Sequence, residues 1–164
     1  MSYSGRQTDY HCAVDGCRRY RIGRKYTSCY GIGGRRVQIG TRFALTEESS
    51  AHFTFKDRCL RLNEGDTQLT LKQLSPVRLV KNDFFKQVEE AESRGATTDE
   101  LRTLLGKGRA KKGIFEGDLF EGELEIGQVA SCIHKLQTVD EVMKELVEDF
   151  NAALNRVNEL QRFI

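Results

Sequence analysis

The residues with the clearest chemical potential lie in a short segment, Val37–Phe43, with the sequence VQIGTRF. Aliphatic residues alternate with the polar Gln38, which predicts a short buried strand. Gly40 and Thr41 follow at its carboxyl end, where backbone N–H groups and a hydroxyl can be presented to an anion. The carboxyl ends of parallel strands are the usual ligand positions in α/β folds. The segment predicts either a phosphate-binding turn or, more simply, a buried strand that leads into a loop.

Four sequence motifs occur in order from this point, and they are the words that carry the comparison below: VQIGTRF, TEESSAHFTFK, SPVRLVKN and GRAKKGIFEGDLFEGELEIGQVAS. On these words the chain, from Val37 to about Phe150, resembles the C-terminal part of the nitronate monooxygenases, also called 2-nitropropane dioxygenases. These are FMN-dependent TIM-barrel enzymes related to the flavin-type enoyl-ACP reductases. The resemblance implies an α/β fold: the C-terminal fragment of a TIM (β/α)8 barrel, mostly helical, with one or two short strands. It also implies that the phosphate of FMN is lined by Gln38, Ile39, Gly40 and Thr41.

The resemblance further implies a reaction, in which a nitronate is converted to a carbonyl compound and nitrite with O₂. The catalytic histidine of the family lies in the part of the barrel that precedes these words. His11, His52 and His134 match no such motif, so we name no catalytic residue. We therefore expect an incomplete enzyme, inactive alone, whose substrate in the intact protein is a nitronate or a related small molecule. The alternatives are the flavin-type enoyl-ACP reductase branch and a nonenzymatic basic binding module.

The length and composition agree with this expectation. The 164 residues suffice for one modest domain but not for a whole TIM barrel, which needs about 200 residues or more. No apolar run approaches the roughly 18 residues of a membrane span, and the start lacks the apolar core of a signal peptide. These features predict a cytoplasmic protein without a membrane segment. Five scattered cysteines suit free thiols better than a disulfide framework.

The net charge of +2 conceals a change in composition near Arg36. Residues 1–36 contain eight Lys or Arg and two Asp, so the remainder contains 18 basic and 22 acidic residues of the totals of 26 and 24. All five tyrosines occur by Tyr30. This change predicts three regions: an anomalous basic segment at 1–36, the last barrel strand with its following helix at 37–75, and a C-terminal helical part at 76–164.

Three interpretations of residues 1–36 remain open. His11, Cys12 and Cys17 are metal-ligand types, although they lack the paired spacing of a zinc finger. Arginines and tyrosines interleave over residues 18–26, as in an arm that binds nucleic acid, a partner that we consider unlikely. The third interpretation is a frameshift. Read one base later, residues 16–21 can encode AAGGI and residues 29–36 can encode AMALGAEG, and the family has similar words before VQIGTRF. The normal glycine-rich phosphate loop would then be scrambled here, and Gly33 and Gly34 would not replace it.

Local signals place the remaining elements. Thr46 is an expected N-cap for a helix to about Leu62, in which His52 would be a surface or packing residue. Capping signals also start helices at Asn82 and at Thr97. The other expectations are a short strand at 67–71, an extended segment at 77–80 and helix ends near Arg94 and Leu105. A further helix is expected from about Gly127 to Leu136, and it would bury Val129, Ile133 and Cys132.

The glycine-rich segment Gly106–Gly127 contains no ligand motif that we accept. Residues 108–113 lack the GK[ST] ending of a P-loop, and the acidic residues lack the spacing of an EF-hand. We therefore expect its basic residues to form a solvated face; they are Lys107, Arg109, Lys111 and Lys112.

A long amphipathic helix is predicted to follow the sequence TVDE at residues 138–141, which has capping-box spacing. Apolar residues then recur at steps of three and four over about six turns, at Val139, Val142, Leu146, Phe150, Leu154, Val157 and Leu160. In an intact barrel this stripe would pack against neighbouring elements. Left uncovered, it favours self-association.

Overall fold

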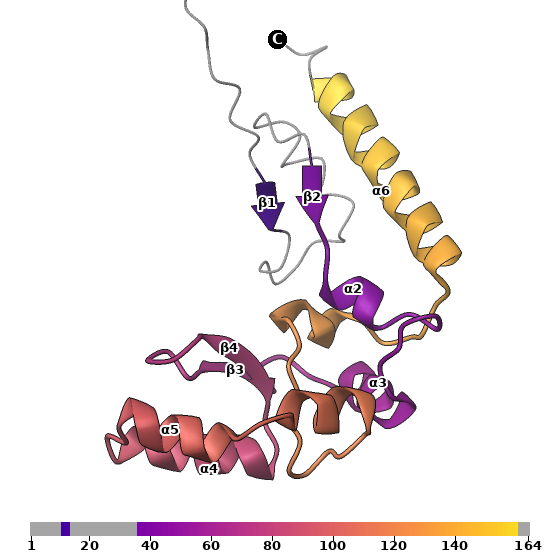
Figure 1. The fold of residues 1–164 in the computed structure, drawn as a ribbon. Helices are drawn as coiled ribbons and strands as arrows, with labels where there is room; N and C mark the ends of the chain where they lie inside the picture. Colours follow the sequence, from indigo (N-terminus) through magenta and orange to yellow (C-terminus); the bar gives the residue numbers. More distant parts are fainter. Residues whose placement is uncertain (1–10, 14–35, 161–164) are drawn as a thin grey trace, which may run out of the picture. The chain divides into compact units, whose positions relative to one another are not determined.

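The computed structural model describes residues 11–13 and 36–160, which belong to two compact units (Figure 1). The first unit comprises Met1–Ile39 and Asp140–Ile164. The second unit is Gly40–Val139. Most of the described structure is helical, and the strands are short.

The described part of the first unit contains a parallel strand pair. Strand β1, His11–Ala13, pairs with β2, Arg36–Gln38, in the register His11↔Arg36 to Ala13↔Gln38. The strand predicted from VQIGTRF is therefore present, shifted by one residue toward the N-terminus. Strand β1 was not predicted, because no sequence signal in the basic segment indicated it.

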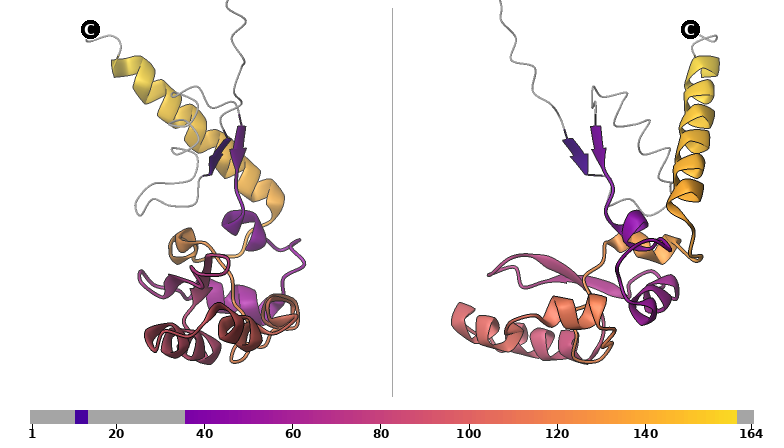
Figure 2. Two further views of the ribbon diagram at one scale, coloured as in Figure 1. Left: turned by 60° about the vertical axis from the view of Figure 1, so that its left-hand side comes forward. Right: turned by 45° about the vertical axis from the view of Figure 1, so that its right-hand side comes forward.

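Helix α6, Val139–Leu160, is a continuous helix of 22 residues, and its existence confirms the prediction from the apolar period (Figure 2). Two acidic residues, Asp140 and Glu141, lie in its first turn, where they interact favourably with the helix dipole.

The second unit starts with a short helix, α2, at Thr41–Ala44, and continues to α3 at Phe53–Leu60. The predicted helix from Thr46 to about Leu62 is wrong in its first part. The side chain of His52 is the N-cap of α3, and it accepts a hydrogen bond from the backbone N–H of Thr54 at 3.2 Å. The hydroxyl of Thr46 instead donates to the carbonyl of Phe43 at 2.8 Å, and the backbone of Thr46 pairs with Gln137, so no helix begins there.

Strands β3, Thr67–Thr70, and β4, Val77–Val80, form an antiparallel hairpin in the register Thr67↔Val80 to Thr70↔Val77. Both were predicted. Residues 124–126 extend this sheet, because the N–H of Val80 donates to the carbonyl of Leu124 at 3.0 Å and the N–H of Ile126 donates to that of Arg78 at 3.2 Å.

Helices α4, Asp83–Ser93, and α5, Thr98–Leu105, confirm the predicted helical pair. The Asn82 side chain accepts the N–H of Phe85 at 2.9 Å, and Thr97 forms a full capping box with Glu100. Each cap satisfies N–H groups that have no partner within the helix.

Two shorter helices complete the second unit: a π-helix at Lys111–Phe115 and a 3₁₀ helix at Gln128–Cys132. The predicted helix from about Gly127 to Leu136 is therefore present only in its first part. It ends at Cys132, because the backbone is extended at Ile133. Cys132 is exposed, contrary to the prediction that it is buried, whereas Val129 and Ile133 are buried as predicted.

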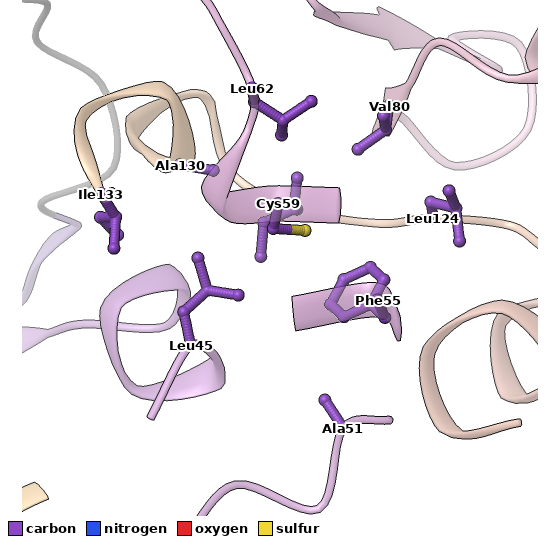
Figure 3. Packing of buried hydrophobic residues seen from close by; sticks show 10 residues of the cluster. Leu45, Ala51, Phe55, Cys59, Leu62, Val80, Leu124, Ala130 and Ile133 are labelled. Atoms are coloured by element: carbon purple, nitrogen blue, oxygen red, sulfur yellow. The ribbon is translucent and has the colours of Figure 1, made fainter. Parts of the chain in front are cut away.

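The buried residues of the second unit form two clusters. In the first cluster, side chains from α3, from β4 and from residues 45–51 and 124–133 converge (Figure 3). Its members are Leu45, Ala51, Phe55, Cys59, Leu62, Val80, Leu124, Ile126, Ala130 and Ile133. The second joins the β3–β4 hairpin to α4 and α5: Leu71, Leu79, Phe84, Phe85, Val88, Ala91, Ala96 and Leu101. The second unit thus has a core of its own.

Two phenylalanines of α3 provide a matched test of this core. Phe55 is 1% exposed and Phe53 is 69% exposed. We expect Phe55→Ala to lower the free energy of unfolding by about 3–5 kcal/mol, because it removes buried apolar contacts and leaves a cavity. The same change at Phe53 should alter it by no more than about 0.5 kcal/mol. Urea unfolding followed by circular dichroism measures both, and equal losses would contradict the assignment of the core.

Candidate functional site

The four residues predicted to line a phosphate are contiguous at the exit of β2. Gln38 ends the strand and is exposed, and Ile39 is half-buried; both belong to the first unit. Gly40 precedes α2 and is exposed, whereas Thr41 is buried in the first turn of α2; both belong to the second unit.

The hydroxyl of Thr41 is held in place by a residue far along the chain. The backbone N–H of Gly127 donates to Thr41 Oγ1 at 3.1 Å. The carbonyl of Gly40 accepts the N–H groups of Phe43 and Ala44 at 3.1 and 2.9 Å, which closes the turn. Because Thr41 Oγ1 accepts in this contact, its own proton remains a donor. A hydroxyl whose oxygen is held in place and the first N–H groups of a helical turn are suited to an anionic oxygen.

Arg42 and Gln137 lie next to this turn and were missed by sequence reasoning. The guanidinium of Arg42 donates to the side-chain oxygen of Gln137, 95 residues away. Both residues are buried, at 6% and 7% exposure. The backbone carbonyl of Gln137 also accepts the N–H of Glu47 at 3.0 Å. No local sequence pattern indicates this contact, because its two partners come from opposite ends of the second unit.

A carboxylate strengthens the same connection. The backbone N–H of Val139, the first residue of α6, donates to both side-chain oxygens of Glu48, at 2.9 and 3.0 Å. An acid at this position satisfies an otherwise unpartnered helix N–H and interacts favourably with the helix dipole. The segment after α2 therefore holds the segment that leads into α6.

Three glycines of the 106–127 segment, Gly113, Gly117 and Gly122, pack closely against other parts of the chain. A Cβ atom on Gly117 would clash with His52 Nδ1, and one on Gly122 would clash with the Cα of Gly113. Gly117 also has a positive φ of 81°, which glycine adopts readily. His52 is thus a structural residue, and its Nδ1 lies 2.6 Å from the hydroxyl of Thr54. That hydroxyl donates a hydrogen bond to the carbonyl of Gly117 at 3.2 Å.

Lys107, Lys111 and Lys112 are exposed, as the sequence predicted, whereas Arg109 does not belong to a solvated face. Arg109 is half-buried, its guanidinium lies 4.5 Å from the ring centroid of Phe84, and it contacts the Glu121 carboxylate at 3.2 Å. Lys112 contacts Asp118 at 2.8 Å, and Lys111 contacts Glu116 at 3.1 Å. These ion pairs form because the acidic residues follow the basic run closely in the sequence, so the chain can fold back and bring them together.

Glu123 is a buried acid in the same segment, with 6% exposure. Burial raises the pKa of Glu123 to about 7, and the charge of Glu125 and a hydrogen bond with it add to the rise, whereas Arg109 opposes it. The carboxyl group is therefore largely protonated below neutral pH. Sequence reasoning missed this residue, because its neighbours give no sign that it is buried.

The other candidate groups do not form a site in the described residues. Burial raises the pKa of Cys59 to about 12, so its thiol is not a ready nucleophile. His134 is exposed. Residues 11–13 and 36–160 contain no group of three or more His, Cys, Asp or Glu side chains placed to hold a metal ion. Cys17 and the arginines and tyrosines of the proposed nucleic-acid arm lie outside the described residues. The helices in the described ranges are too short or too polar to cross a bilayer.

Comparison with known proteins gives consistent relatives. A family model described as nitronate monooxygenase matches residues 23–149. A probable nitronate monooxygenase of Bacillus subtilis (strain 168) is 27% identical over 119 residues, which are 72% of this chain and 34% of that protein. The match to the family model begins inside the basic segment, at Gly23.

Solved structures share the fold. FabK from Thermotoga maritima matches with a TM-score of 0.76 and 24% identity, over 94% of this chain and 47% of FabK. Nitroalkane oxidase from Streptomyces ansochromogenes matches with a TM-score of 0.63 and 23% identity, over 90% of this chain and 40% of that one. The fold is thus part of a TIM-barrel-type architecture, which confirms the predicted class. The chain spans about a third of the curated relative and less than half of these structures.

Replacement of Glu123 by glutamine tests the electrostatics of the acidic segment. Glu123 binds its proton more tightly in the folded state, so its contribution to stability is fully present below the ordinary pKa of 4.5 and is lost as pH rises to about 7. Gln resembles the protonated acid. We therefore expect Glu123→Gln to raise the free energy of unfolding by roughly 1–3 kcal/mol at pH 8 and to change it little at pH 4.

The matched control is Glu89→Gln on the exposed face of α4, which should have a small effect at both pH values. Urea unfolding at the two pH values measures the difference. A destabilising effect of Glu123→Gln at pH 8 would show that the ionised carboxylate is the form that the fold requires.

Proposed function

The chain belongs to the nitronate monooxygenase family, and on that premise we propose that it provides the FMN-phosphate end of a flavin-dependent oxidoreductase. The proposed reaction converts a nitronate to a carbonyl compound and nitrite with O₂. The observation that carries the proposal is the exit of β2 from a parallel strand pair into a turn whose threonine hydroxyl is held by Gly127.

The residues present fit a phosphate group. Thr41 Oγ1 accepts from the Gly127 N–H, so its proton can be donated to a phosphate oxygen. Gly40 is exposed and has no side chain, which lets a ligand approach the backbone closely. Gln38 is exposed at the end of β2. We propose that Gly40 and Thr41 bind the phosphate, while Gln38 and Ile39 line it.

Bound FMN would supply the redox chemistry, and this chain's residues would hold its phosphate and orient it. We propose no proton-transfer residue in this chain. His52 is committed to capping α3, and the Cys59 thiol is buried. The catalytic base and the nitronate-binding surface would then come from barrel strands that have no counterpart among the described residues.

We expect the chain by itself to bind FMN weakly or not at all, because a two-stranded sheet contributes one wall of a flavin site. Quenching of FMN fluorescence on titration with the purified chain measures this affinity. Saturable binding in the micromolar range would contradict the expectation and would mean that the chain holds a sufficient site.

A substitution at Thr41 tests the phosphate contact in a protein that joins this chain to further barrel strands. Thr41→Val keeps the shape and removes the hydroxyl, so we expect roughly a tenfold loss of FMN affinity, the value of one hydrogen bond to a charged group. The affinity for riboflavin, which lacks the phosphate, should change little. Thr70→Val is the control, because Thr70 is also buried and its hydroxyl has no partner in the structure. Equal losses for FMN and riboflavin would exclude Thr41 from the phosphate site.

The same joined protein tests the reaction. Oxygen uptake together with nitrite release from an alkyl nitronate is the expected result. Reduction of an enoyl thioester at the expense of a reduced nicotinamide, without nitrite release, would instead assign the protein to the enoyl-ACP reductase branch. The coding sequence from upstream of Met1 through Val37 should be determined first, because it tests the frameshift interpretation of residues 1–36 directly.

A further inference from the structure

Helix α6 carries a row of exposed apolar side chains. Five large hydrophobic residues on this helix are 36% to 53% exposed: Val139, Met143, Val147, Leu154 and Val157. Leu146, Phe150 and Ala153 lie beside them and are half-buried. A contiguous apolar stripe of this kind is uncommon on a solvated helix and indicates an interaction surface.

The spacing of these residues has the period of a coiled coil. Val139, Met143, Leu146, Phe150, Ala153 and Val157 follow one another at alternating steps of four and three, which is the d–a–d–a–d–a pattern of a heptad repeat. Val147 and Leu154 occupy the adjoining e positions. A seam with this period suits a second helix of similar length, so a helix rather than a loop or a small ligand is the expected occupant.

The charges of α6 favour an antiparallel partner of the same sequence. Residues 139–149 contain five acidic residues and one lysine, a net charge of −4, whereas residues 150–160 contain one arginine and one glutamate, a net charge of zero. Two parallel copies would place the acidic halves side by side. An antiparallel pair places each acidic half beside the neutral half, which reduces the repulsion.

We propose that α6 pairs in antiparallel orientation with α6 of a second copy of this chain. The proposed register is the one in which Phe150 faces the small Ala153 of the second copy. Leu146 then faces Val157 of the second copy. At the flanking positions Val147 lies beside Leu154 of the second copy, and Asp149 lies beside Arg156 of the second copy. The two-fold symmetry repeats each contact, so the large and small side chains and the opposite charges match on both sides.

Sedimentation velocity of the full chain over a range of concentrations tests the pairing. We expect a monomer–dimer equilibrium. Val147→Glu with Leu154→Glu should shift it to monomer, because it places charges in the apolar stripe. The control, Ala152→Glu with Asn155→Glu, adds the same two charges at exposed positions away from the seam and should leave the dimer intact. Circular dichroism verifies that each variant keeps its helices.

A charge exchange tests the orientation. Arg156→Asp should weaken the dimer, because it places a second carboxylate beside Asp149 of the second copy, and adding Asp149→Arg should restore the attraction. Parallel helices cannot bring these two positions together, so their dimer would show no such rescue.

Three results would overturn the proposal: a chain that stays monomeric at all concentrations, a dimer that survives Val147→Glu with Leu154→Glu, or a dimer that the control weakens equally. The proposal would also be overturned by a longer protein that includes further barrel strands, if that protein is monomeric and is unfolded by Val147→Glu with Leu154→Glu. The apolar stripe would then pack within one molecule.

Discussion

A hydrogen-bonded connection between residues 41–48 and residues 127–139 fixes the first segment of the second unit. The Gly127 N–H holds the hydroxyl of Thr41, the guanidinium of Arg42 donates to the side chain of Gln137, and Glu48 accepts the N–H of Val139. These contacts close a loop of nearly the whole second unit. They determine where α2 lies relative to the core of the second unit. The first cluster of buried residues contains side chains from both segments, Leu45 from one and Ala130 and Ile133 from the other.

Two buried cations, Arg42 and Lys56, donate hydrogen bonds in this part of the second unit. Arg42 donates to the Gln137 amide, and Lys56 donates through Nζ to the carbonyls of Glu47 and Ser49, at 3.2 and 2.8 Å. Burying a charge is costly unless its hydrogen-bonding capacity is met. Such hydrogen bonds are directional, so they restrict the conformation of the 42–49 backbone more than apolar packing would. The segment has no regular secondary structure beyond α2, so this directional bonding provides much of its order.

The sequence predicted the elements whose determinants are local and missed those whose determinants are distant. Helices α4 and α5 follow from the caps at Asn82 and Thr97 and from the apolar period. Helix α6 follows from its apolar period and from the capping-box spacing of residues 138–141. Thr46 has the same chemical type as a cap, yet its hydroxyl bonds to Phe43 and its backbone pairs with Gln137, so the helix starts seven residues later. The burial of Glu123 and the stacking of Arg109 on Phe84 likewise depend on chain segments that no local pattern connects. For the candidate site, the residue types in VQIGTRF indicated the turn, but the contact that holds Thr41 comes from Gly127, 86 residues away.

The two halves of the proposed phosphate turn depend on different sources of order. Gly40 and Thr41 belong to the second unit, whose two buried clusters both lie within residues 45–133. Gln38 and Ile39 belong to the first unit, whose strand pair is three residues long. Isolated pairs of such short strands are marginally stable, and parallel strands are normally covered on both faces by helices of the same barrel. The hydroxyl and glycine part of the turn is therefore anchored by the core of the second unit, whereas the strand part requires neighbouring strands.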